Sequence, residues 1–311
     1  MTNIMQKTPI KRIGILAYGG VQMSAVLGLA DVFSVASRIG EPLGWVGFEV
    51  KVLAQEGIDE GAFDVIIVPP SLSGVRGEGE QRVHSWLQKQ AASGALVCSV
   101  CAGAFWLGYA ELLDGRPVTT HWALEVEFTR AFPAAQLASE HMLIDDGNLI
   151  TAGGVMAWVD LGLHLVDRFA GGDIMARTAR HLLVDPPRRA QSHYQRFEPE
   201  MAHGDANILF VQRWLEGQID GAVSIGHMAG RASCSNRSLL RRFKAATGFS
   251  PMQYVQRLRI ERARGYLERG RLPVGEIGYR LGYQDSSAFI RVFRQITGLS
   301  PAAYRKRFYC A

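Results

Sequence analysis

The sequence has 311 residues, of which 48% are hydrophobic and 20% are charged, and it carries a formal net charge of +5. This composition is ordinary for a globular chain of about two domains, and four cysteines in so long a chain exclude a disulfide framework. Residues 1–203 hold 16 Lys and Arg against 22 Asp and Glu, whereas residues 204–311 hold 18 against 7. An acidic body with a basic C-terminal end indicates a polyanionic partner at that end.

Two long uncharged runs, 13–30 and 94–110, raise the alternatives of a signal peptide and a membrane span. Lys11 and Arg12 precede the first run, as basic residues precede the apolar core of a signal peptide. Each run nevertheless splits naturally into a strand followed by a helix, and glycines and polar residues interrupt the first. We therefore expect a cytoplasmic protein with neither a signal peptide nor a membrane span.

Short apolar runs alternate with amphipathic segments over most of residues 10–184. The expected strands are 13–18, 48–54, 63–69, 95–100 and 149–152, and the expected helices are 21–38, 78–93, a helix after 103, and a helix from 154 to 169. Such alternation is typical of a mostly parallel sheet covered by helices on both faces. We interpret residues 10–184 as an α/β domain.

The composition changes after Asp185, where the sequence becomes polar, proline-led and aperiodic. This pattern is typical of a linker between domains, and we interpret residues 185–204 in this way. Helical periodicity begins again at Asn207, so residues 205–311 are expected to form an all-α domain.

The second domain contains one sequence block twice, at 241–254 and at 291–304. Arg, Phe, Thr, Gly, Ser, Pro and Tyr recur in register between the two copies. Two copies are too few for a solenoid, so they indicate one duplicated supersecondary unit.

Each copy has the layout of a helix-turn-helix. Ser235 and Asp285 are expected to cap the second helix of each unit, and Gly248 and Gly298 to end it in the left-handed conformation. A long helix over 252–268 is expected to connect the units.

Large apolar side chains four residues apart form the inward face of each second helix. The outward faces then present side chains suited to reading the major groove, namely Asn236, Arg237, Leu240 and Arg241 in the first copy and Ser286, Ser287, Ile290 and Arg291 in the second. A solvated basic face is the alternative for one isolated helix, but duplication with both caps and both turns favours DNA binding.

This region resembles the AraC/XylS transcription regulators in two stretches. Residues 235–243 follow the pattern Ser-x-Arg-x-Leu-x-Arg-x-Phe, and residues 282–305 run from Gly-Tyr-Gln-Asp to Gly-Leu-Ser-Pro-Ala-Ala-Tyr-Arg. The resemblance covers the last third of the chain. It implies two helix-turn-helix units that read adjacent segments of the major groove of double-stranded DNA, with RNA polymerase as a partner and activation as the output.

Cys101 is placed where a strand breaks into a helix, with Gly103 two residues on, which is the pattern of a nucleophile elbow. A helix N-terminus can lower the pKa of such a thiol, and His121 follows within plausible reach. Residues 101–108, with 113–116 and 120–122, resemble the PfpI-like, class I glutamine amidotransferase-like domain that precedes AraC-type domains in bacterial regulators. The resemblance implies a domain that senses a ligand and forms a homodimer.

Two positions depart from that family and favour a sensor over an enzyme. Relatives carry an acidic residue in the first helix, where this chain has Ala25, and glycines after the third strand, where it has Pro69-Pro70. Proline has no N–H to stabilise an oxyanion. We therefore expect no catalytic residue, metal or cofactor, and interpret Cys101 and His121 as a degenerate elbow within an effector site lined by Cys101, Ala102, Thr120, His121 and Trp122.

The predicted function is a ligand-responsive transcription activator. Resemblance suggests an amino-acid-like or quaternary-amine effector, and Trp106, Trp122 and Trp158 are candidates for a cation pocket, although tryptophans are more often plain core. One alternative is a cysteine hydrolase tethered to DNA, and another is a thiol redox sensor that uses Cys98 and Cys101.

Overall fold

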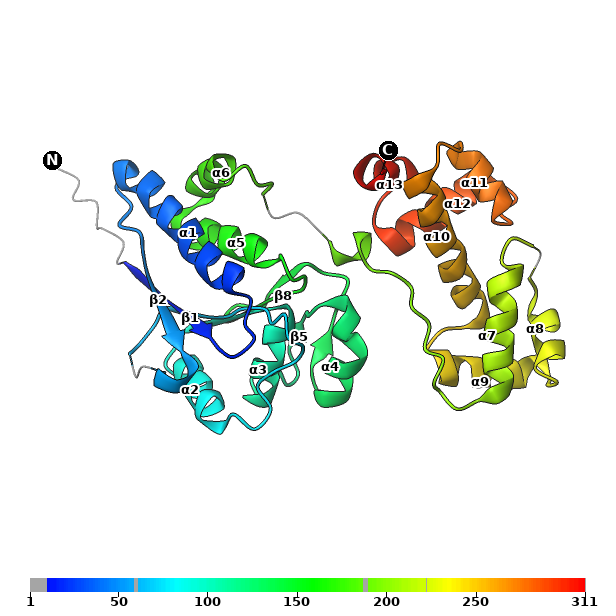
Figure 1. Cartoon of the computed structure of the whole chain (residues 1–311), viewed down its shortest axis with the longest axis horizontal. Coiled ribbons are helices and arrows are strands. Elements are labelled where there is room, and N and C mark those ends of the chain that lie inside the picture. The colour runs from blue at the N-terminus through cyan, green and yellow to red at the C-terminus, as the bar shows by residue number, and fades with distance from the viewer. Residues whose placement is uncertain (1–9, 59–60, 187–189, 222, 311) are drawn as a thin grey trace. The chain divides into compact units, whose positions relative to one another are not determined.

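The structure is a computed structural model that describes residues 10–58, 61–186, 190–221 and 223–310. The chain divides into two compact units, Met1–Gln191 and Ser192–Ala311, and each is described by itself (Figure 1). The division lies within the segment 185–204 that the sequence predicts as the linker.

A mixed sheet with the strand order β2-β1-β3-β4-β8-β7 forms the centre of the N-terminal unit. The strands from β2 to β8 run parallel, and β7 is antiparallel to β8, while β5 and β6 form a small separate pair. The bounds are β1 Lys11–Ala17, β2 Phe48–Ala54, β3 Val65–Val68, β4 Leu96–Val100, β5 Pro117–Val118, β6 Gln136–Leu137, β7 Leu143–Asp145 and β8 Leu149–Ala152. The expected mostly parallel sheet is confirmed. The sequence missed β5, β6 and β7 because strands of two or three residues are too short to show alternation.

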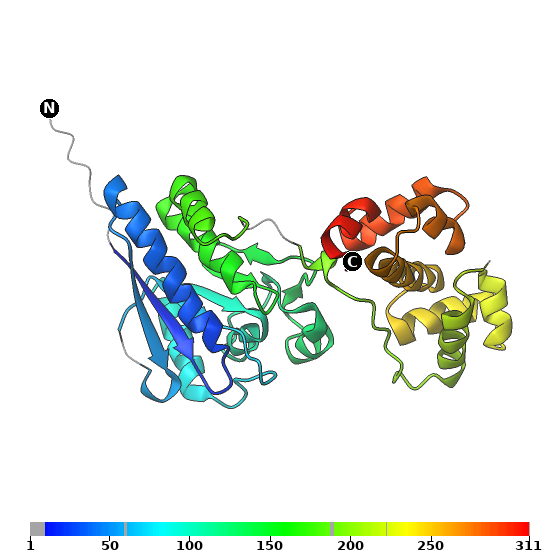
Figure 2. The same ribbon diagram turned by 45° about the horizontal axis from the view of Figure 1, so that its top comes forward.

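Helices cover both faces of this sheet (Figures 1 and 2). One face carries α1, α5 and α6, and the other carries α2, α3 and α4. The bounds are α1 Met23–Gly40, α2 Gln81–Ala92, α3 Ala104–Tyr109, α4 Glu125–Ala131, α5 Trp158–Ala170 and α6 Gly172–His181. Alternate residues of each strand enter opposite layers: Ile15 packs with the first group of helices and Leu16 with the second.

The two apolar layers separate tryptophans that the sequence suggests as one cation pocket. Trp106 is buried in the layer that contains α3, whereas Trp158 packs against the layer that contains α1 and α5. Large aromatic side chains contribute most to stability when they fill such layers, which accounts for both positions.

By length and composition alone, the segment Met23–Leu43 is long and apolar enough to cross a membrane. Val26, Leu29 and Phe33 of this segment are fully buried in the layer between α1 and the sheet. A core helix passes the same test, so this one segment is weak evidence for a membrane span.

The carboxyl ends of the parallel strands bring several loops to one edge. In the sheet β2 lies on one side of β1, and β3 lies on the other side. The direction in which successive strands are added therefore reverses between β1 and β3. Open α/β sheets bind ligands at such a switch point. The residues that follow the strands there are Tyr18, Pro69, Cys101 and Gly153.

The C-terminal unit is all-α, as the sequence predicts. Its helices are α7 Ala206–Gln218, α8 Ile225–Arg231, α9 Asn236–Thr247, α10 Pro251–Arg269, α11 Val274–Arg280, α12 Ser286–Thr297 and α13 Pro301–Phe308. One apolar cluster joins α7, α8, α9 and the start of α10, and another joins the end of α10 to α11, α12 and α13. Helices α8–α9 and α11–α12 are therefore two helix-turn-helix units connected by α10.

The duplication extends to individual hydrogen bonds. Thr247 donates to the carbonyl of Phe243 at 2.7 Å, and Thr297 donates to the carbonyl of Phe293 at 2.8 Å. Each hydroxyl also accepts the backbone N–H two residues later, at 3.2 and 3.3 Å. The two helix ends are thus closed by the same device, which explains why threonine and glycine recur in register.

Gly248 and Gly298 both end their helices at positive φ, 77° and 75°. We expect Gly248→Ala to cost about 1 kcal/mol, because an L-residue is strained in this conformation. Gly298→Ala should cost more, since the new Cβ would also lie 2.9 Å from the Ser192 hydroxyl, whereas Gly248 faces open space. Amide hydrogen exchange of α9 and α12 in the whole protein measures both losses.

The control is Gly217→Ala in α7, where φ is not positive and the added methyl group meets nothing within 4 Å. Alanine favours a helix interior, so this change should leave stability equal or higher. Equal exchange rates in all three variants would show that the left-handed helix ends carry no strain.

Candidate functional site

The second helix of each helix-turn-helix exposes the face that the sequence predicts for DNA. Ser235 accepts the Ser238 N–H at 3.3 Å to begin α9, and Asp285 accepts the Ala288 N–H at 2.9 Å to begin α12. The inward side chains Leu239, Phe243, Phe289 and Phe293 are fully buried. The predicted contact residues are exposed, apart from Ser286, which is half-buried; they are Asn236, Arg237, Leu240, Arg241, Ser287, Ile290 and Arg291.

Four arginines on these two helices are available to a polyanion. Among the described residues, Arg237, Arg241, Arg291 and Arg294 make no hydrogen bond or ion pair. Arg242 differs, because both sides of its guanidinium bind Asp205, at 2.6 and 2.8 Å. The sequence analysis places Arg241, but not Arg242, on the outward face. The structure agrees, since Arg242 is bound to Asp205 whereas Arg241 has no partner among the described residues.

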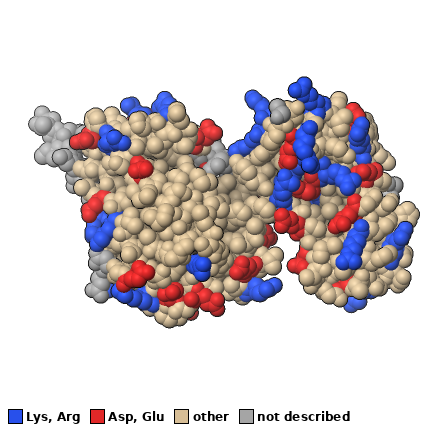
Figure 3. Space-filling view, in the orientation of Figure 1, with Lys and Arg blue, Asp and Glu red and all other residues tan. Residues whose placement is uncertain are grey.

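Figure 3 shows Lys and Arg side chains spread over the C-terminal unit, with acidic side chains between them on this face. A shallow depression lies on the outer face of α12 and is lined by Ser287, Ile290, Arg291, Arg294 and Gln295. Arginine side chains bind DNA phosphates and guanine edges, and hydroxyl and aliphatic side chains contact other base edges. The depression therefore offers groups suited to both the phosphates and the bases of DNA.

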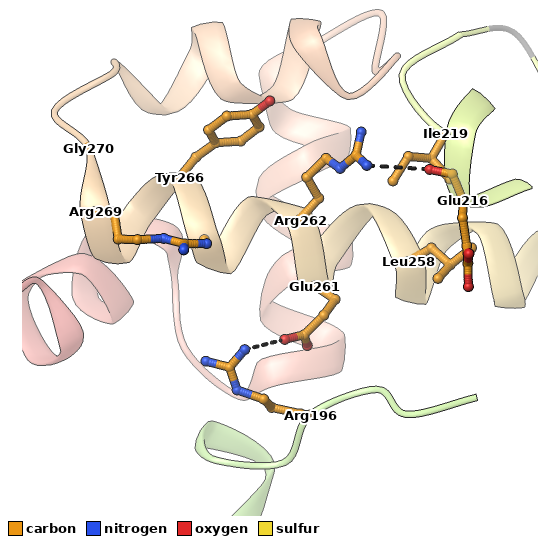
Figure 4. A pocket seen from close by; sticks show the side chains of 10 residues that line it. Arg196, Glu216, Ile219, Leu258, Glu261, Arg262, Tyr266, Arg269 and Gly270 are labelled. Carbon is orange, nitrogen blue, oxygen red and sulfur yellow. Dashed lines mark hydrogen bonds and ion pairs between the residues drawn. The ribbon is translucent and has the colours of Figure 1, made fainter. Parts of the chain in front are cut away.

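A separate cleft of about 630 Å³ lies beside α10 (Figure 4). Arg196 forms an ion pair with Glu261 at 2.9 Å, and Arg262 donates to the carbonyl of Glu216 at 3.3 Å. These two contacts tie the segments that carry Arg196 and Glu216 to α10, and we interpret the cleft as a place where these segments support the connecting helix.

The N-terminal unit contains the predicted elbow. Cys101 has φ of +54°, a left-handed conformation that few non-glycine residues adopt, and it lies directly after β4. A Cβ at Gly103 would collide with the carbonyl oxygens of Val68 and Pro69, so this turn requires glycine. The close approach of Gly103 to the end of β3 constrains this turn, as strained residues require of their surroundings.

The chemistry at the elbow differs from what the sequence suggests. Burial raises the pKa of the Cys101 thiol to about 11, and the Ala102 N–H offsets only part of this. The expectation that the start of a helix lowers this pKa is therefore wrong, because the thiol is 3% exposed and desolvation disfavours the thiolate.

His121 does not act as a base toward this thiol in the structure. Its Nδ1 accepts the Ala123 N–H at 3.1 Å, and it makes no hydrogen bond with Cys101 among the described residues. Burial lowers the pKa of His121, so the ring is neutral near pH 7. Its ring lies beside that of Trp122, with the centroids 5.3 Å apart.

Oxyanion donors are also missing where relatives have glycines. Pro69 and Pro70 follow β3, and their carbonyl groups are occupied by the Tyr18 hydroxyl at 2.6 Å and the Gln22 N–H at 2.8 Å. Ala25 of α1, at the position expected for an acid, is fully buried in apolar surroundings. The unit therefore keeps an elbow without a thiolate, a base or a second oxyanion donor at these positions.

The predicted effector residues lie together, but most of them are covered. Cys101, Ala102 and Thr120 are almost fully buried, and only His121 and Trp122 are half-buried. The Thr120 hydroxyl donates to the carbonyl of Cys101 at 2.8 Å, which joins the two parts of the predicted site.

Sequence reasoning missed the residue that covers this site. Gln191 is 1% exposed, and its carboxamide hydrogen-bonds to the loop that carries Thr119, Thr120 and Trp122. It lies in a polar, aperiodic segment, where nothing local signals burial.

The sequence patterns of two families match this chain. Residues 228–307 match the helix-turn-helix domain family, and residues 31–168 match the DJ-1/PfpI family. The transcriptional regulator ArgR of Pseudomonas aeruginosa is 30% identical over 223 residues, which span 71% of this chain and 67% of that protein. The chain belongs to the AraC family of transcription regulators with a DJ-1/PfpI-type N-terminal domain.

Two further relatives are similar to this regulator over different parts of the chain. The regulator GbdR of Pseudomonas aeruginosa is 25% identical over 264 residues, covering 84% of this chain and 71% of its own length. An isonitrile hydratase of Pseudomonas putida is 33% identical over 174 residues, covering 52% of this chain and 73% of the hydratase. The AraC-family regulator described here is therefore similar to regulators over both units and to an enzyme over the N-terminal unit.

Arg237→Ala should weaken binding to the cognate site by about 1–3 kcal/mol if the guanidinium reads a guanine, with a much smaller loss on random DNA. Equilibrium binding of the whole protein to a site selected from random DNA measures both quantities, and affinity should fall steeply with salt. Arg130→Ala is the control, since Arg130 is an exposed arginine of the N-terminal unit without a partner among the described residues.

Equal losses on cognate and random DNA would instead assign Arg237 to a phosphate. Salt-independent binding would contradict the DNA-reading assignment of these helices.

Proposed function

We propose that this AraC-family regulator is a homodimeric, cytoplasmic transcription activator that responds to a small molecule bound by its N-terminal unit and acts with RNA polymerase. The observation that supports the DNA-binding part is the pair of capped helices whose exposed arginines have no internal partner within the part of the chain that the structure describes. The resemblance of residues 235–243 and 282–305 to the AraC/XylS family supports activation as the output, and the similarity to regulators over both units supports a sensor domain joined to a DNA-binding domain.

Binding would proceed through both helix-turn-helix units. Helix α9 would contact one segment of the major groove through Arg237 and Arg241. Helix α12 would contact another segment through Arg291. Asn236, Leu240, Ser287 and Ile290 would add base-edge and thymine-methyl contacts, and Ser286 a contact at the start of α12.

The effector would bind beside the elbow, at residues Cys101, Ala102, Thr120, His121 and Trp122. Resemblance to the family suggests an amino-acid-like or a quaternary-amine compound, and the contacts at the site bear on the choice between such classes. This edge of the sheet is where open α/β folds place ligands, and the strained turn at Cys101 is retained although the thiol is protonated.

We propose that the unit performs no hydrolysis. The supporting observations are the raised thiol pKa, the occupied Nδ1 of His121 and the prolines after β3. The alternative, a hydratase- or hydrolase-type activity, is favoured by the similarity to isonitrile hydratase and by the elbow itself. A redox role for Cys98 is disfavoured, because burial strongly raises its pKa and the thiolate is the reactive form.

Cys101→Trp or Trp122→Ala should blunt the effector response of a reporter gene, because either change alters the shape of the site, while operator binding without effector is kept. Cys101→Ser should keep the response, since the side chains are nearly the same size. The effector is first sought by thermal shift of the purified protein with amino acids, amides and quaternary amines. Cys310→Ser, at an exposed cysteine of the C-terminal unit, is the control.

Turnover of glutamine, a small amide or an alkyl isonitrile by the wild type, abolished by Cys101→Ser, would replace the sensor assignment with an enzyme. A full effector response in both Cys101→Trp and Trp122→Ala would move the effector site elsewhere.

A further inference from the structure

The side chain of Gln191 is inserted into the N-terminal unit like a ligand. Its Nε2 donates toward the carbonyl of Thr120 at 2.8 Å, the carbonyl of His141 at 2.9 Å and the hydroxyl of Thr119 at 3.1 Å. Its Oε1 accepts the Trp122 N–H at 3.3 Å. Both ends of the carboxamide are therefore satisfied, although the residue is 1% exposed.

The groups around this side chain define which ligand chemistry fits. Three oxygens converge on the amide nitrogen and one N–H faces the amide oxygen. A carboxylate would place oxygen against those oxygens, and a quaternary ammonium has no N–H to donate. An isolated ammonium would be buried without an opposite charge among these partners, which is costly. The arrangement is complementary to a neutral primary carboxamide.

Gly153 makes the space for this carboxamide. A Cβ built on Gly153, which follows β8, would overlap the side-chain amide of Gln191. Its φ is not in the positive range, so the backbone itself does not require glycine here. The neighbouring Gly154 differs, because its Cβ would meet only the Met142 sulfur, at an ordinary 3.6 Å.

The carboxamide site adjoins the elbow through Thr120. The carbonyl of Thr120 accepts from Gln191, and its hydroxyl donates to the carbonyl of Cys101 at 2.8 Å. Trp122, which binds the other end of the carboxamide, is one of the predicted effector residues. Gln191 therefore covers the site at which the effector is proposed to bind.

Gln191 is the last residue of the N-terminal unit, and the next residue is held by the C-terminal unit. The backbone N–H of Gln191 donates to the backbone carbonyl of Glu140 at 3.0 Å. The carbonyl of Ser192 accepts from Arg264 of α10 at 3.2 Å, and Arg264 is 2% exposed in the helix that connects the two DNA-reading units. Release of Gln191 would therefore detach the chain from the N-terminal unit one residue before Ser192, which stays bonded to Arg264.

We propose that the pocket formed by Thr119, Thr120, Trp122, His141 and Gly153 is a primary-carboxamide site, that Gln191 occupies it in the absence of effector, and that an effector carrying a primary carboxamide displaces it. This rests on the proposed effector site and names its ligand class. The displacement changes no covalent bond. It exchanges one set of hydrogen bonds for the same set made by the ligand.

The first test uses the whole protein and propionamide, which has the size and chemistry of the glutamine side chain. Gln191→Ala should melt a few degrees below the wild type, and propionamide should restore part of this loss. Propionate should restore none of it. The wild type should gain far less from propionamide, because its site is already filled. A variant that gains nothing from propionamide, or gains as much from propionate, would overturn the carboxamide site.

The second test displaces the Gln191 side chain by a substitution at Gly153, which lies against it. Gly153→Ala keeps Gln191 but fills its place, so the backbone amide of Gln191 should exchange faster, and Gln191→Ala combined with Gly153→Ala should no longer respond to propionamide. Gly154→Ala is the matched control and should behave as the wild type. Unchanged exchange in Gly153→Ala would overturn the proposal, and this holds even if Gln191→Ala does not fold.

The third test concerns coupling to DNA. Gln191→Ala should change the operator affinity of the whole protein without any ligand, and the same substitution at Gln195, four residues further on, should change it much less. Unchanged operator affinity in a variant that binds propionamide would overturn the coupling. None of these tests needs the effector. They can fail although the protein responds to an effector and Cys101→Trp abolishes that response, which would leave the proposed function intact. They can also succeed although no effector response exists, which would leave the carboxamide site intact.

Discussion

Both DNA-reading helices depend on one connecting helix, α10, being packed at both of its ends. Tyr254 and Val255 belong to the first apolar cluster, and Ile260, Ala263 and Leu267 belong to the second. A helix of 19 residues is about 28 Å long, on the order of one turn of DNA, which is about 34 Å. The stiffness of α10 therefore sets the spacing at which two units of the same design present their exposed arginines.

Two arginines of α10, Arg259 and Arg262, reinforce this arrangement through contacts inside the unit. Arg259 donates to the carbonyl groups of Ile219 and Gly221, both at 2.8 Å, and Arg262 pairs with Asp220 at 3.0 Å. These contacts hold α10 in position. The structure thus distinguishes arginines with an internal partner, such as Arg259 and Arg262, from those without one among the described residues, such as Arg237 and Arg291, which we propose for DNA.

The N-terminal unit keeps the geometry of an elbow but not the chemistry that an elbow normally serves. A strained φ at Cys101 and a close approach at Gly103 are costly features, and they persist where the thiol remains protonated. An unusual backbone can be useful for shape alone, since the carbonyl of Cys101 accepts the Thr120 hydroxyl and so holds the loop that binds Gln191.

Local rules account for what the sequence could predict. Ser235 and Asp285 cap helices because their side chains reach backbone N–H groups three residues on, and Gly248 and Gly298 end helices because they tolerate positive φ. These rules act over a few residues, and apart from the half-buried Ser286 they correctly predict which side chains of α9 and α12 are exposed and which are buried.

Long-range contacts account for what the sequence could not predict. The raised pKa of Cys101 depends on burial by distant segments, and local reasoning from the helix start gave the wrong sign. Gln191 bonds to Thr119 and Thr120 across 72 and 71 residues, and its own segment reads as a linker. The pairing of Arg242 with Asp205, 37 residues apart, is likewise invisible without the fold.

Reading by two helix-turn-helix units is tested most directly by methylation interference on the cognate operator, because guanine N7 lies in the major groove. We expect two interfering segments for each protein chain, about one helical turn apart, with Arg237→Ala erasing interference in one segment and Arg291→Ala in the other. A single segment, or two segments that both substitutions affect equally, would contradict reading by two independent helix-turn-helix units.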